Sequence, residues 1–213
     1  MTGTTKEQIP DPVMRRLSYY LRALTSGSMV GHATVSSRGL AQSAGTTPAT
    51  LRKDLNLLRV KGRAGIGYAV EDLVPALESA LGLDQQWRVA IVGAGHLGTA
   101  LAGYSGFQRR GYPVVAIFDT APNVVGTDVA GLTVEDLAGL ESVIQEKSVN
   151  MAVVTVPGDS AQDVLDRLVG AGVRSILSFA PVALQVPDGV SLRRVDLASE
   201  LSLLAHRSGP VPH

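Results

Sequence analysis

Apolar side chains recur at helical spacing near the start of the chain. In residues 11–27, Val13, Leu17 and Leu24 lie four and seven positions apart, which predicts one amphipathic helix. Ser36-Ser37 is expected to open a second, shorter helix, because serine is a favoured N-cap.

A third helix is predicted to start at Thr47-Pro48, since threonine caps a helix and proline is tolerated at its first position. Leu51 and Leu55 mark its apolar face, and the glycine turn 44–46 separates it from the helix before. Glycines within 61–70 predict two short strands joined by a basic turn. Helices, tight turn, helix and hairpin follow one another as in a winged helix-turn-helix.

The pattern changes after Trp87, where short β-branched runs alternate with helical stretches. This alternation predicts an α/β fold with a Rossmann-type doubly wound parallel sheet. Strands are expected over 88–92, 114–118, 151–156, 175–179 and 190–195, and helices over 134–147, 160–169 and 196–207. A helix over 71–83 is predicted to link two modules. The expected domains are a winged helix at 1–82, a dinucleotide-binding domain at 83–195 and a C-terminal helix with tail at 196–213.

Composition narrows the chemistry that these modules can perform. Of 213 residues, 45% are hydrophobic and 18% are charged, which is typical of a globular protein. The absence of cysteine excludes disulfides, zinc–thiolate centres and thiol redox sensing, so any redox role needs a bound cofactor. No metal site is expected. No apolar run approaches membrane-span length and residues 1–10 are polar, which predicts a cytoplasmic location without membrane contact.

Charge is distributed unevenly along the chain. Residues 15–63 hold nine basic side chains and one acidic side chain, Asp54, which points to a polyanion such as double-stranded DNA. Arginine suits bidentate contact with guanine, whereas lysine suits phosphates. A small helical domain with a solvated cationic face is the alternative. The candidate DNA contacts are Arg16, Thr47, Thr50, Arg52, Lys53, Arg59, Lys61 and Arg63.

A glycine-rich loop follows the first strand predicted in the second half. Its sequence is Gly93-Ala94-Gly95-His96-Leu97-Gly98, and Asp119 lies 21 residues beyond its last glycine. In such a loop the first glycine permits a tight turn, and the second lets the backbone approach the pyrophosphate closely. The third lets the helix pack against the strand. Asp119 would accept hydrogen bonds from the ribose hydroxyls and would repel a 2′-phosphate. This favours NAD(H) over NADP(H). A glycine turn that serves packing alone is the alternative.

General acids and bases are scarce after this loop. Lysine occurs there once, at Lys147, and histidine twice, at His206 and His213. His96 within the loop is expected to pack near phosphates. Since a dehydrogenase needs a proton donor or acceptor and a substrate domain, we expect binding without turnover and no enzyme activity.

Seven short motifs together resemble the redox-sensing transcriptional repressor Rex family of bacteria, over nearly the whole chain. The N-terminal motifs are Arg16-Leu17-Ser18-Tyr19-Tyr20-Leu21, Leu51-Arg52-Lys53-Asp54-Leu55 and Gly65-Ile66-Gly67-Tyr68-Ala69-Val70. The others, beside the glycine loop, are Tyr104-Ser105-Gly106-Phe107, Thr155-Val156-Pro157, Ile176-Leu177-Ser178-Phe179-Ala180-Pro181 and Val195-Asp196-Leu197.

The resemblance implies a homodimer that binds a pseudo-palindromic operator when NADH is scarce and releases it when NADH binds. It implies that the final helix is exchanged between subunits and that Arg52 and Lys53 contact DNA. Arg22, Tyr104 and Asp196 would form a polar switch. Residues 57–62 depart from the family pattern, which has an aromatic–glycine pair in the wing.

NADH is expected to bind more tightly than NAD+, which would be a weaker competitor. The oxidised ring carries a positive charge, so an apolar site disfavours it through lost hydration. Candidate residues for this site are Phe107, Phe179, Ala180 and Pro181, with Thr155, Val156 and Pro157 as further cofactor contacts.

Three other functions are compatible with parts of this pattern. The chain could be a small NAD-dependent oxidoreductase, a regulator that binds another nucleotide such as a coenzyme A derivative, or an architectural DNA-binding protein with a vestigial second domain. Turnover assays and nucleotide binding distinguish them.

Overall fold

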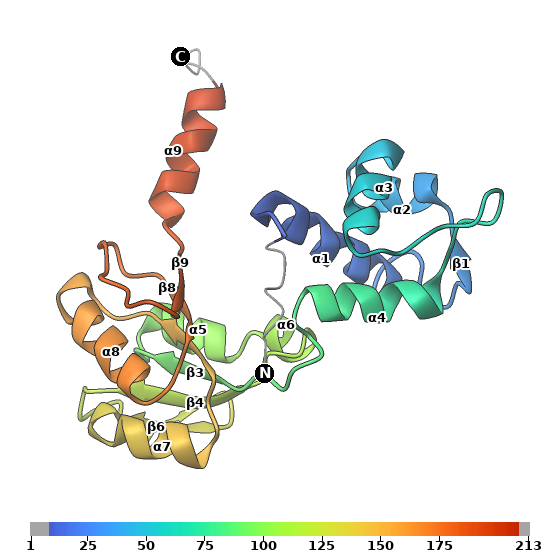
Figure 1. The fold of residues 1–213 in the computed structure, drawn as a ribbon. Helices are drawn as coiled ribbons and strands as arrows, with labels where there is room; N and C mark the ends of the chain where they lie inside the picture. Colours follow the sequence, from blue (N-terminus) through green and yellow to red (C-terminus); the bar gives the residue numbers. More distant parts are fainter. Residues whose placement is uncertain (1–8, 209–213) are drawn as a thin grey trace. The chain divides into compact units, whose positions relative to one another are not determined.

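The computed structural model describes residues 9–208 (Figure 1). The chain divides into two compact units, Met1–Gln85 and Gln86–His213. Residues 1–8 and 209–213 lie outside the described range, and with them the start of the first predicted domain and the end of the predicted C-terminal segment.

From residue 9 onward, the N-terminal unit contains four helices and a two-stranded antiparallel sheet. Ser36 and Thr47 cap α2 and α3 as predicted: their side-chain oxygens accept from the backbone N–H groups of Gly39, at 3.0 Å, and Thr50, at 3.1 Å. The elements are α1 (Asp11–Thr25), β1 (Thr34–Val35), α2 (Ser37–Ser43), α3 (Pro48–Leu57), β2 (Tyr68–Ala69) and α4 (Val70–Ala80). Its core includes Leu17, Tyr20, Leu40, Leu51, Leu55, Leu73 and Leu77.

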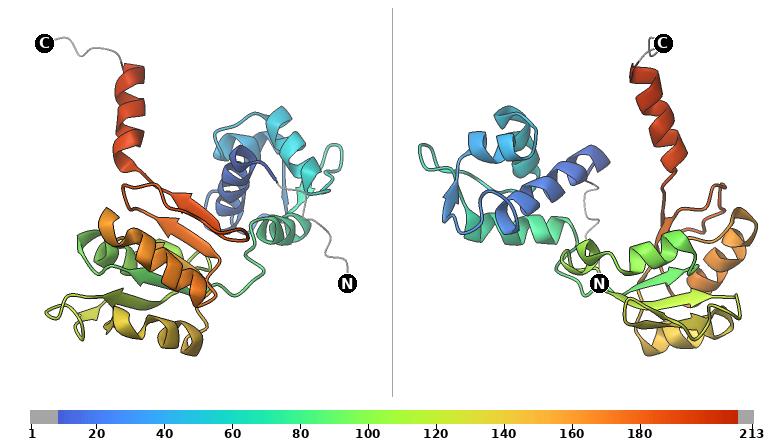
Figure 2. Two further views of the ribbon diagram at one scale, coloured as in Figure 1. Left: turned by 60° about the vertical axis from the view of Figure 1, so that its left-hand side comes forward. Right: turned by 180° about the vertical axis from the view of Figure 1, so that it is seen from behind.

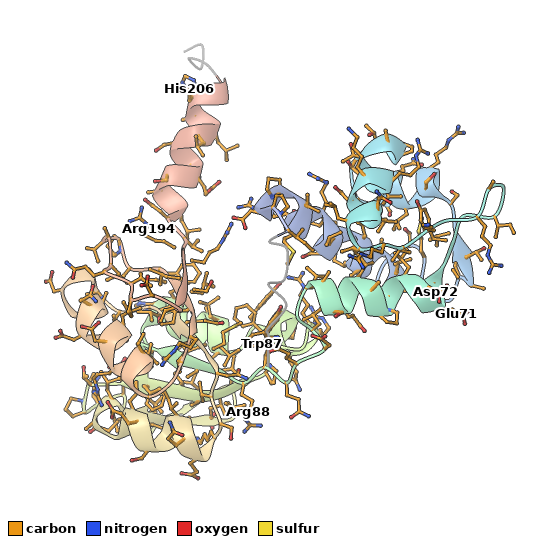
Figure 3. All side chains as sticks on the ribbon, viewed as in Figure 1. Glu71, Asp72, Trp87, Arg88, Arg194 and His206 are labelled. Carbon is orange, nitrogen blue, oxygen red and sulfur yellow. The ribbon has the colours of Figure 1, made fainter. Side chains whose placement is uncertain are left out.

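Helix α4 does more than link the two modules, because its fully buried Leu73 and Leu77 belong to the unit's core, while Glu71 and Asp72 lie exposed at its first turn (Figure 3). One expectation for this unit is wrong. The wing lacks two paired strands of its own. It contains a single bridge, between Arg63 and Gly67, and β2 pairs with β1.

The C-terminal unit is built on a seven-stranded sheet in the order β5-β6-β4-β3-β7-β8-β9. All neighbouring strands are parallel except β5 and β6. The strands are β3 (Val89–Val92), β4 (Val114–Asp119), β5 (Asp128–Val129), β6 (Leu132–Asp136), β7 (Met151–Val154), β8 (Ser175–Ser178) and β9 (Ser191–Arg194).

Helices cover both faces of this sheet (Figure 2). Alternate residues of the strands point to opposite faces, so Ala90 and Val92 belong to one core cluster and Ile91 to another. Buried side chains of α7 (Leu140–Glu146) and α8 (Gly158–Gly170) pack in the first cluster, and Leu101 of α5 (His96–Ala102) packs against the second. The short helices α6 (Ser105–Gln108) and η1 (Leu137–Gly139) complete the unit. The predicted doubly wound α/β fold is confirmed.

The helix predicted over 134–147 is wrong in its first part. Residues 132–136 form β6, which pairs with β4 on one side and β5 on the other. Ala130 and Gly131, both at positive φ, form the two-residue turn between β5 and β6. Val134 is buried in the core of the sheet, and β6 pairs with a strand on each side. Together, this burial and this pairing outweigh the helix propensity of the acidic segment that follows.

The last element of the described range is α9 (Leu197–Ser208), which begins just after Arg194 and carries His206 near its end (Figure 3). Leu197, Leu201 and Leu204 are each 59–67% exposed. Among the described residues, no helix has the length and apolarity that crossing a membrane requires.

Candidate functional site

The glycine loop lies where the strand order of the parallel sheet reverses. It leaves the carboxyl end of β3, and residues 155–157 leave the adjacent β7. Ligands of doubly wound sheets bind at this topological switch point, in the crevice outside the carboxyl ends of the strands.

The three glycines of the loop meet different constraints. Gly93 has φ +104°, which side chains of L-residues rarely allow, and a Cβ on Gly98 would lie 1.8 Å from the Gly93 carbonyl oxygen. A Cβ on Gly95, in contrast, would meet no atom within 4 Å. The protein's own packing therefore requires Gly93 and Gly98, whereas Gly95 leaves open space beside the backbone.

Two polar side chains hold the loop in place. The Thr155 hydroxyl lies within hydrogen-bonding distance of the carbonyl oxygens of Val92 (3.0 Å) and Gly93 (2.8 Å). Asp119, at the end of β4, accepts at Oδ2 from the Ala94 N–H (2.7 Å), and its Oδ1 accepts from two N–H groups of the following turn. Both predicted cofactor residues thus also position the loop.

A cavity of about 460 Å³ opens between these segments. This volume lies within the usual range for small-molecule sites. Six predicted residues line it: Gly93, Gly95, Asp119, Thr155, Val156 and Pro157. Five others were not predicted: Val92, Thr120, Leu137, Ser160 and Val164.

The remaining cofactor candidates lie outside this lining. Ala94 and Gly98 are buried in the loop, and His96 and Leu97 are exposed on the first turn of α5. Ala180 is buried and Pro181 exposed. The four predicted nicotinamide contacts therefore do not line this cavity, and their contact with the ring stays a prediction.

Phe107 and Phe179 pack elsewhere in the unit. The Phe107 ring meets Tyr104 edge-on at 5.3 Å between centroids. Phe179 is half-buried and packs against the core cluster on the α5 face of the sheet.

A groove of about 940 Å³ runs between α3 and the wing in the N-terminal unit. Its lining contains four predicted cations, Arg52, Lys53, Lys61 and Arg63, all of them exposed. Its other lining residues are Ser36, Ser37, Ala49, Asn56, Val60, Gly62, Ala64, Gly65, Ile66, Gly67 and Tyr68. None of these described lining residues is acidic, so the groove has the charge that a polyanion requires.

Arg16 is absent from that lining and belongs to a buried polar network. Its Nε and Nη2 donate to the two carboxylate oxygens of Asp54 at 2.7 and 2.8 Å, and the Tyr20 hydroxyl donates to the same carboxylate at 2.9 Å. Asp54 is 2% exposed. Hydrogen bonding to Asp54 raises the pKa of Arg16, and burial raises that of Tyr20. The network joins α1 to the inner face of α3.

Arg59 ends α3 in a left-handed conformation, with φ +58°. Its N–H donates to Asn56 O at 3.0 Å, and the Val60 N–H donates to Leu55 O at 3.1 Å, which is the Schellman pattern. Gly172 adopts the same arrangement after α8, as glycine usually does there. At Arg59 a side chain is retained despite a conformation that disfavours it.

Thr47 and Thr50 lie at the start of α3, where their hydroxyl oxygens are 2.9 Å apart. The first serves mainly as the helix cap, and neither lines the groove.

The three predicted switch residues have partners of other kinds. The Arg22 guanidinium lies over the Tyr19 ring at 5.7 Å, and the Tyr104 ring lies so close to Gly106 that a Cβ there would clash. Asp196 caps α9 by accepting from the Ser199 hydroxyl (2.6 Å) and from two backbone N–H groups. The Ser199 hydrogen bond lowers the pKa of Asp196. Pairing among the three stays a prediction.

Two family models match the chain. One, described as "Putative DNA-binding protein N-terminus", matches residues 8–56, and the other, described as "CoA binding domain", matches residues 84–182. The first match falls in the N-terminal unit, and all but the first two residues of the second match fall in the C-terminal unit.

Curated proteins and solved structures also resemble the chain over most of its length. The redox-sensing transcriptional repressor Rex of Streptomyces griseus is 50% identical, covering 95% of this chain and 80% of that protein. The crystal structure of RSP, a Rex-family repressor, with β-NAD+ and operator DNA is 35% identical, with TM-score 0.84 and coverage of 94% and 93%. RSP with β-NADH is 34% identical, with TM-score 0.77 and coverage of 97% and 95%. The chain belongs to the redox-sensing transcriptional repressor Rex family.

Proposed function

We propose that this chain represses transcription by binding operator DNA through its N-terminal unit, and that NADH binding in its C-terminal unit releases the DNA. One observation carries the proposal: a single chain combines a cationic groove on a helix-turn-helix with a cleft behind a glycine loop. The crystal structures of RSP with β-NADH, and with β-NAD+ and operator DNA, support the same ligands here. As a DNA-binding regulator it would act in the cytoplasm.

The cleft suits a dinucleotide because the backbone of Gly95 faces open space. The N–H groups at the start of α5 would bind the pyrophosphate, and Asp119 would accept from the ribose hydroxyls. Asp119 already accepts hydrogen bonds from three backbone N–H groups, two at Oδ1 and one at Oδ2, and its one remaining lone pair, on Oδ2, would accept from a ribose hydroxyl. Phe107, Phe179, Ala180 and Pro181 stay predicted nicotinamide contacts.

We propose binding without turnover. Among the described residues that line the cleft, Asp119 is the one with an ionisable side chain, and both its oxygens accept backbone hydrogen bonds. It is therefore poorly placed to act as a general acid or base. Steady NADH consumption with any carbonyl substrate would favour the oxidoreductase alternative.

On DNA, α3 would enter the major groove, with Arg52 on guanine and Lys53 on phosphate. Lys61 and Arg63 of the wing line the same groove of the protein and would contact the neighbouring backbone. Arg16 is proposed to act mainly by holding α3, given its ion pair with Asp54.

A second copy of the chain is the proposed partner of α9. Exposed leucines along this helix form an apolar surface that exchange between subunits would cover. Closure of such a dimer on NADH would change the distance between the two recognition helices. Coupling of this kind is typically worth about 1–3 kcal/mol.

The experiment combines calorimetry with mobility-shift assays on a duplex that this protein selects from a random DNA pool. We expect NADH to bind more tightly than NAD+, NADPH or coenzyme A, and NADH alone to release the duplex. Equal affinity for NADH and NAD+ would contradict redox sensing. Tighter binding of coenzyme A would favour the other nucleotide regulator, and no nucleotide binding would favour the architectural protein.

Replacing Arg59 with glycine should stabilise the protein and weaken DNA binding. Glycine removes the left-handed penalty, so we expect the free energy of unfolding to rise by about 1 kcal/mol. Loss of one phosphate contact should lower duplex affinity and reduce the salt dependence by about one counterion. Urea denaturation and salt-dependent binding measure the two effects.

Ser148→Gly is the matched control. Ser148 ends α7 at φ +50° with the same hydrogen-bond pattern, in the other unit. It should raise stability similarly and leave duplex affinity unchanged. Unchanged DNA binding by Arg59→Gly would remove Arg59 from the interface.

A further inference from the structure

The described residues 179–190 connect β8 to β9 without forming a helix. The two strands are parallel, so this crossover segment must return from the carboxyl end of β8 to the start of β9. Such a crossover is usually an α-helix, which satisfies its own backbone hydrogen bonds. Leu184 and Val190 pack against the core cluster that includes α8, which places the segment on the α8 face of the sheet. Its backbone therefore needs hydrogen-bond partners from elsewhere.

Gln162, in the second turn of α8, supplies such partners. Its Oε1 accepts from the Gln185 N–H at 2.9 Å, and its Nε2 donates to the Gln185 carbonyl oxygen at 3.1 Å. The same Nε2 donates to Asp166 Oδ1, one turn further along α8, at 2.9 Å, which fixes the orientation of the amide. The side chain thus pairs with the Gln185 backbone as a neighbouring strand would.

A second contact holds the crossover segment at the start of α8. A Cβ on Gly158 would lie 2.7 Å from Val182 Cγ1, so the Val182 side chain occupies space that any residue other than glycine would need. Gly158 follows Pro157, and both Pro157 and Ser160 line the cleft. The first half of the crossover segment is therefore fixed against the helix turn that borders the cleft.

The crossover segment begins at the nicotinamide end of a dinucleotide bound in this cleft. In the strand order β4-β3-β7-β8, Asp119 ends β4 and the glycine loop follows β3. A dinucleotide whose adenine-side ribose is at Asp119 and whose pyrophosphate is at the glycine loop extends toward β7 and β8. Phe179, Ala180 and Pro181, three of the predicted nicotinamide contacts, are the first residues after β8.

We infer that Gln162 is a positioning residue that sets the preference for NADH over NAD+, an inference that rests on the proposed function. The two nucleotides differ only at the nicotinamide ring, so the preference depends on residues at that end. Held by Gln162, the crossover segment would keep its apolar first residues against the ring and exclude water. An apolar wall costs the cationic ring of NAD+ its hydration, whereas the neutral ring of NADH has no charge to lose it from.

The test measures three affinities of the full-length protein by calorimetry, for NADH, NAD+ and ADP-ribose, which lacks the ring. We expect Gln162→Ala to lower NADH affinity about tenfold, since two hydrogen bonds that hold the segment are lost. NAD+ affinity should fall by less than about twofold, because water then reaches the charged ring. ADP-ribose affinity should stay unchanged. A residue that merely stabilised the fold would lower all three affinities together.

Gln145→Ala is the matched control. Gln145 lies on α7, and its Nε2 donates to the Ala171 carbonyl oxygen at 2.8 Å, so this variant loses a side-chain-to-backbone hydrogen bond outside the crossover segment. It should lower the thermal unfolding temperature as Gln162→Ala does, and leave the ratio of NADH to NAD+ affinity at its wild-type value.

Gly158→Ala tests the same placement without changing Gln162. Its methyl group would displace Val182, so the ratio should fall as in Gln162→Ala. Adding Val182→Ala should restore the ratio, because the Val182 Cβ that remains lies 3.8 Å from the new methyl group. Where Gln162→Ala fails to fold, these two variants decide the question.

Three results would overturn the inference while the proposed function stands. They are a wild-type ratio in folded Gln162→Ala, an equal loss of ADP-ribose and NADH affinity in it, and the same fall of the ratio in Gln145→Ala. Equal affinity of the wild type for NADH and NAD+ would instead overturn the proposed function, and the inference with it.

Discussion

Replacing Gly98 with alanine should abolish NADH binding and destabilise the C-terminal unit by about 3 kcal/mol, a large value for a single added methyl group. The new Cβ would lie 1.8 Å from the Gly93 carbonyl oxygen and 2.9 Å from the Thr155 hydroxyl. The Gly93 carbonyl group is part of the backbone and cannot rotate away as the end of a flexible side chain can. The glycine loop and the start of α5 would therefore have to move apart. Urea denaturation and calorimetry with NADH measure the two losses.

Gly95→Ala is the control that separates binding from stability. Its Cβ would meet no protein atom within 4 Å and its φ is −71°, so we expect stability to change by no more than about 0.5 kcal/mol. The methyl group would still occupy space that the pyrophosphate needs, so NADH affinity should fall at least tenfold.

Both glycine variants should still bind the selected duplex, because the N-terminal unit has a core of its own. NADH should no longer release that duplex from either of them. Normal NADH affinity of Gly95→Ala would show that the pyrophosphate does not lie on this loop.

The sequence is most informative where a feature depends on a few neighbouring residues. The caps Ser36 and Thr47, and the glycine loop between strand and helix, are recognisable from residues within one or two turns. Asn56, which lines the DNA groove, follows Arg52 by four positions and could have been found by helical spacing.

Features that depend on strand pairing are harder to predict. The sequence predicts a helix from residue 134, where β6 forms instead, and so it does not predict that Leu137, just past the carboxyl end of β6, lines the cleft. The turn at Ala130-Gly131 is a local signal for the hairpin, although alanine is unusual at positive φ. Pairing with β4, distant in sequence, decides the outcome.

Ion pairs between distant residues have no local signal at all. Arg16 and Asp54 are 38 positions apart, so the sequence presents them as one candidate DNA contact and one isolated acid. In the fold they neutralise each other. The remaining charged side chains of residues 15–63 are all basic, so this segment still carries a positive charge. The prediction that it binds a polyanion therefore does not depend on Arg16, which lies outside the groove lining.

Replacing Asp54 with alanine should destabilise the N-terminal unit by about 2–3 kcal/mol and weaken DNA binding. The change removes the acceptor for Arg16 and for the buried Tyr20 hydroxyl. Breaking a fully buried pair costs about 3–5 kcal/mol, and the 27% exposure of the Arg16 side chain reduces this because water reaches the guanidinium. Urea denaturation and duplex titration give the two values.

Two further variants separate positioning from direct contact. Asp72→Ala removes an exposed acid and so changes the net charge equally, but should leave stability within about 0.5 kcal/mol. Arg16→Met with Tyr20→Phe and Asp54→Leu replaces the whole network by apolar side chains, leaves no buried hydroxyl without an acceptor, and should recover stability to within about 1 kcal/mol of wild type. Recovery of duplex affinity with it would mean that Arg16 only holds α3 in place. A stable triple variant that fails to bind the duplex would instead assign Arg16 a direct contact with DNA, because the scaffold that carries Arg52 and Lys53 would be intact.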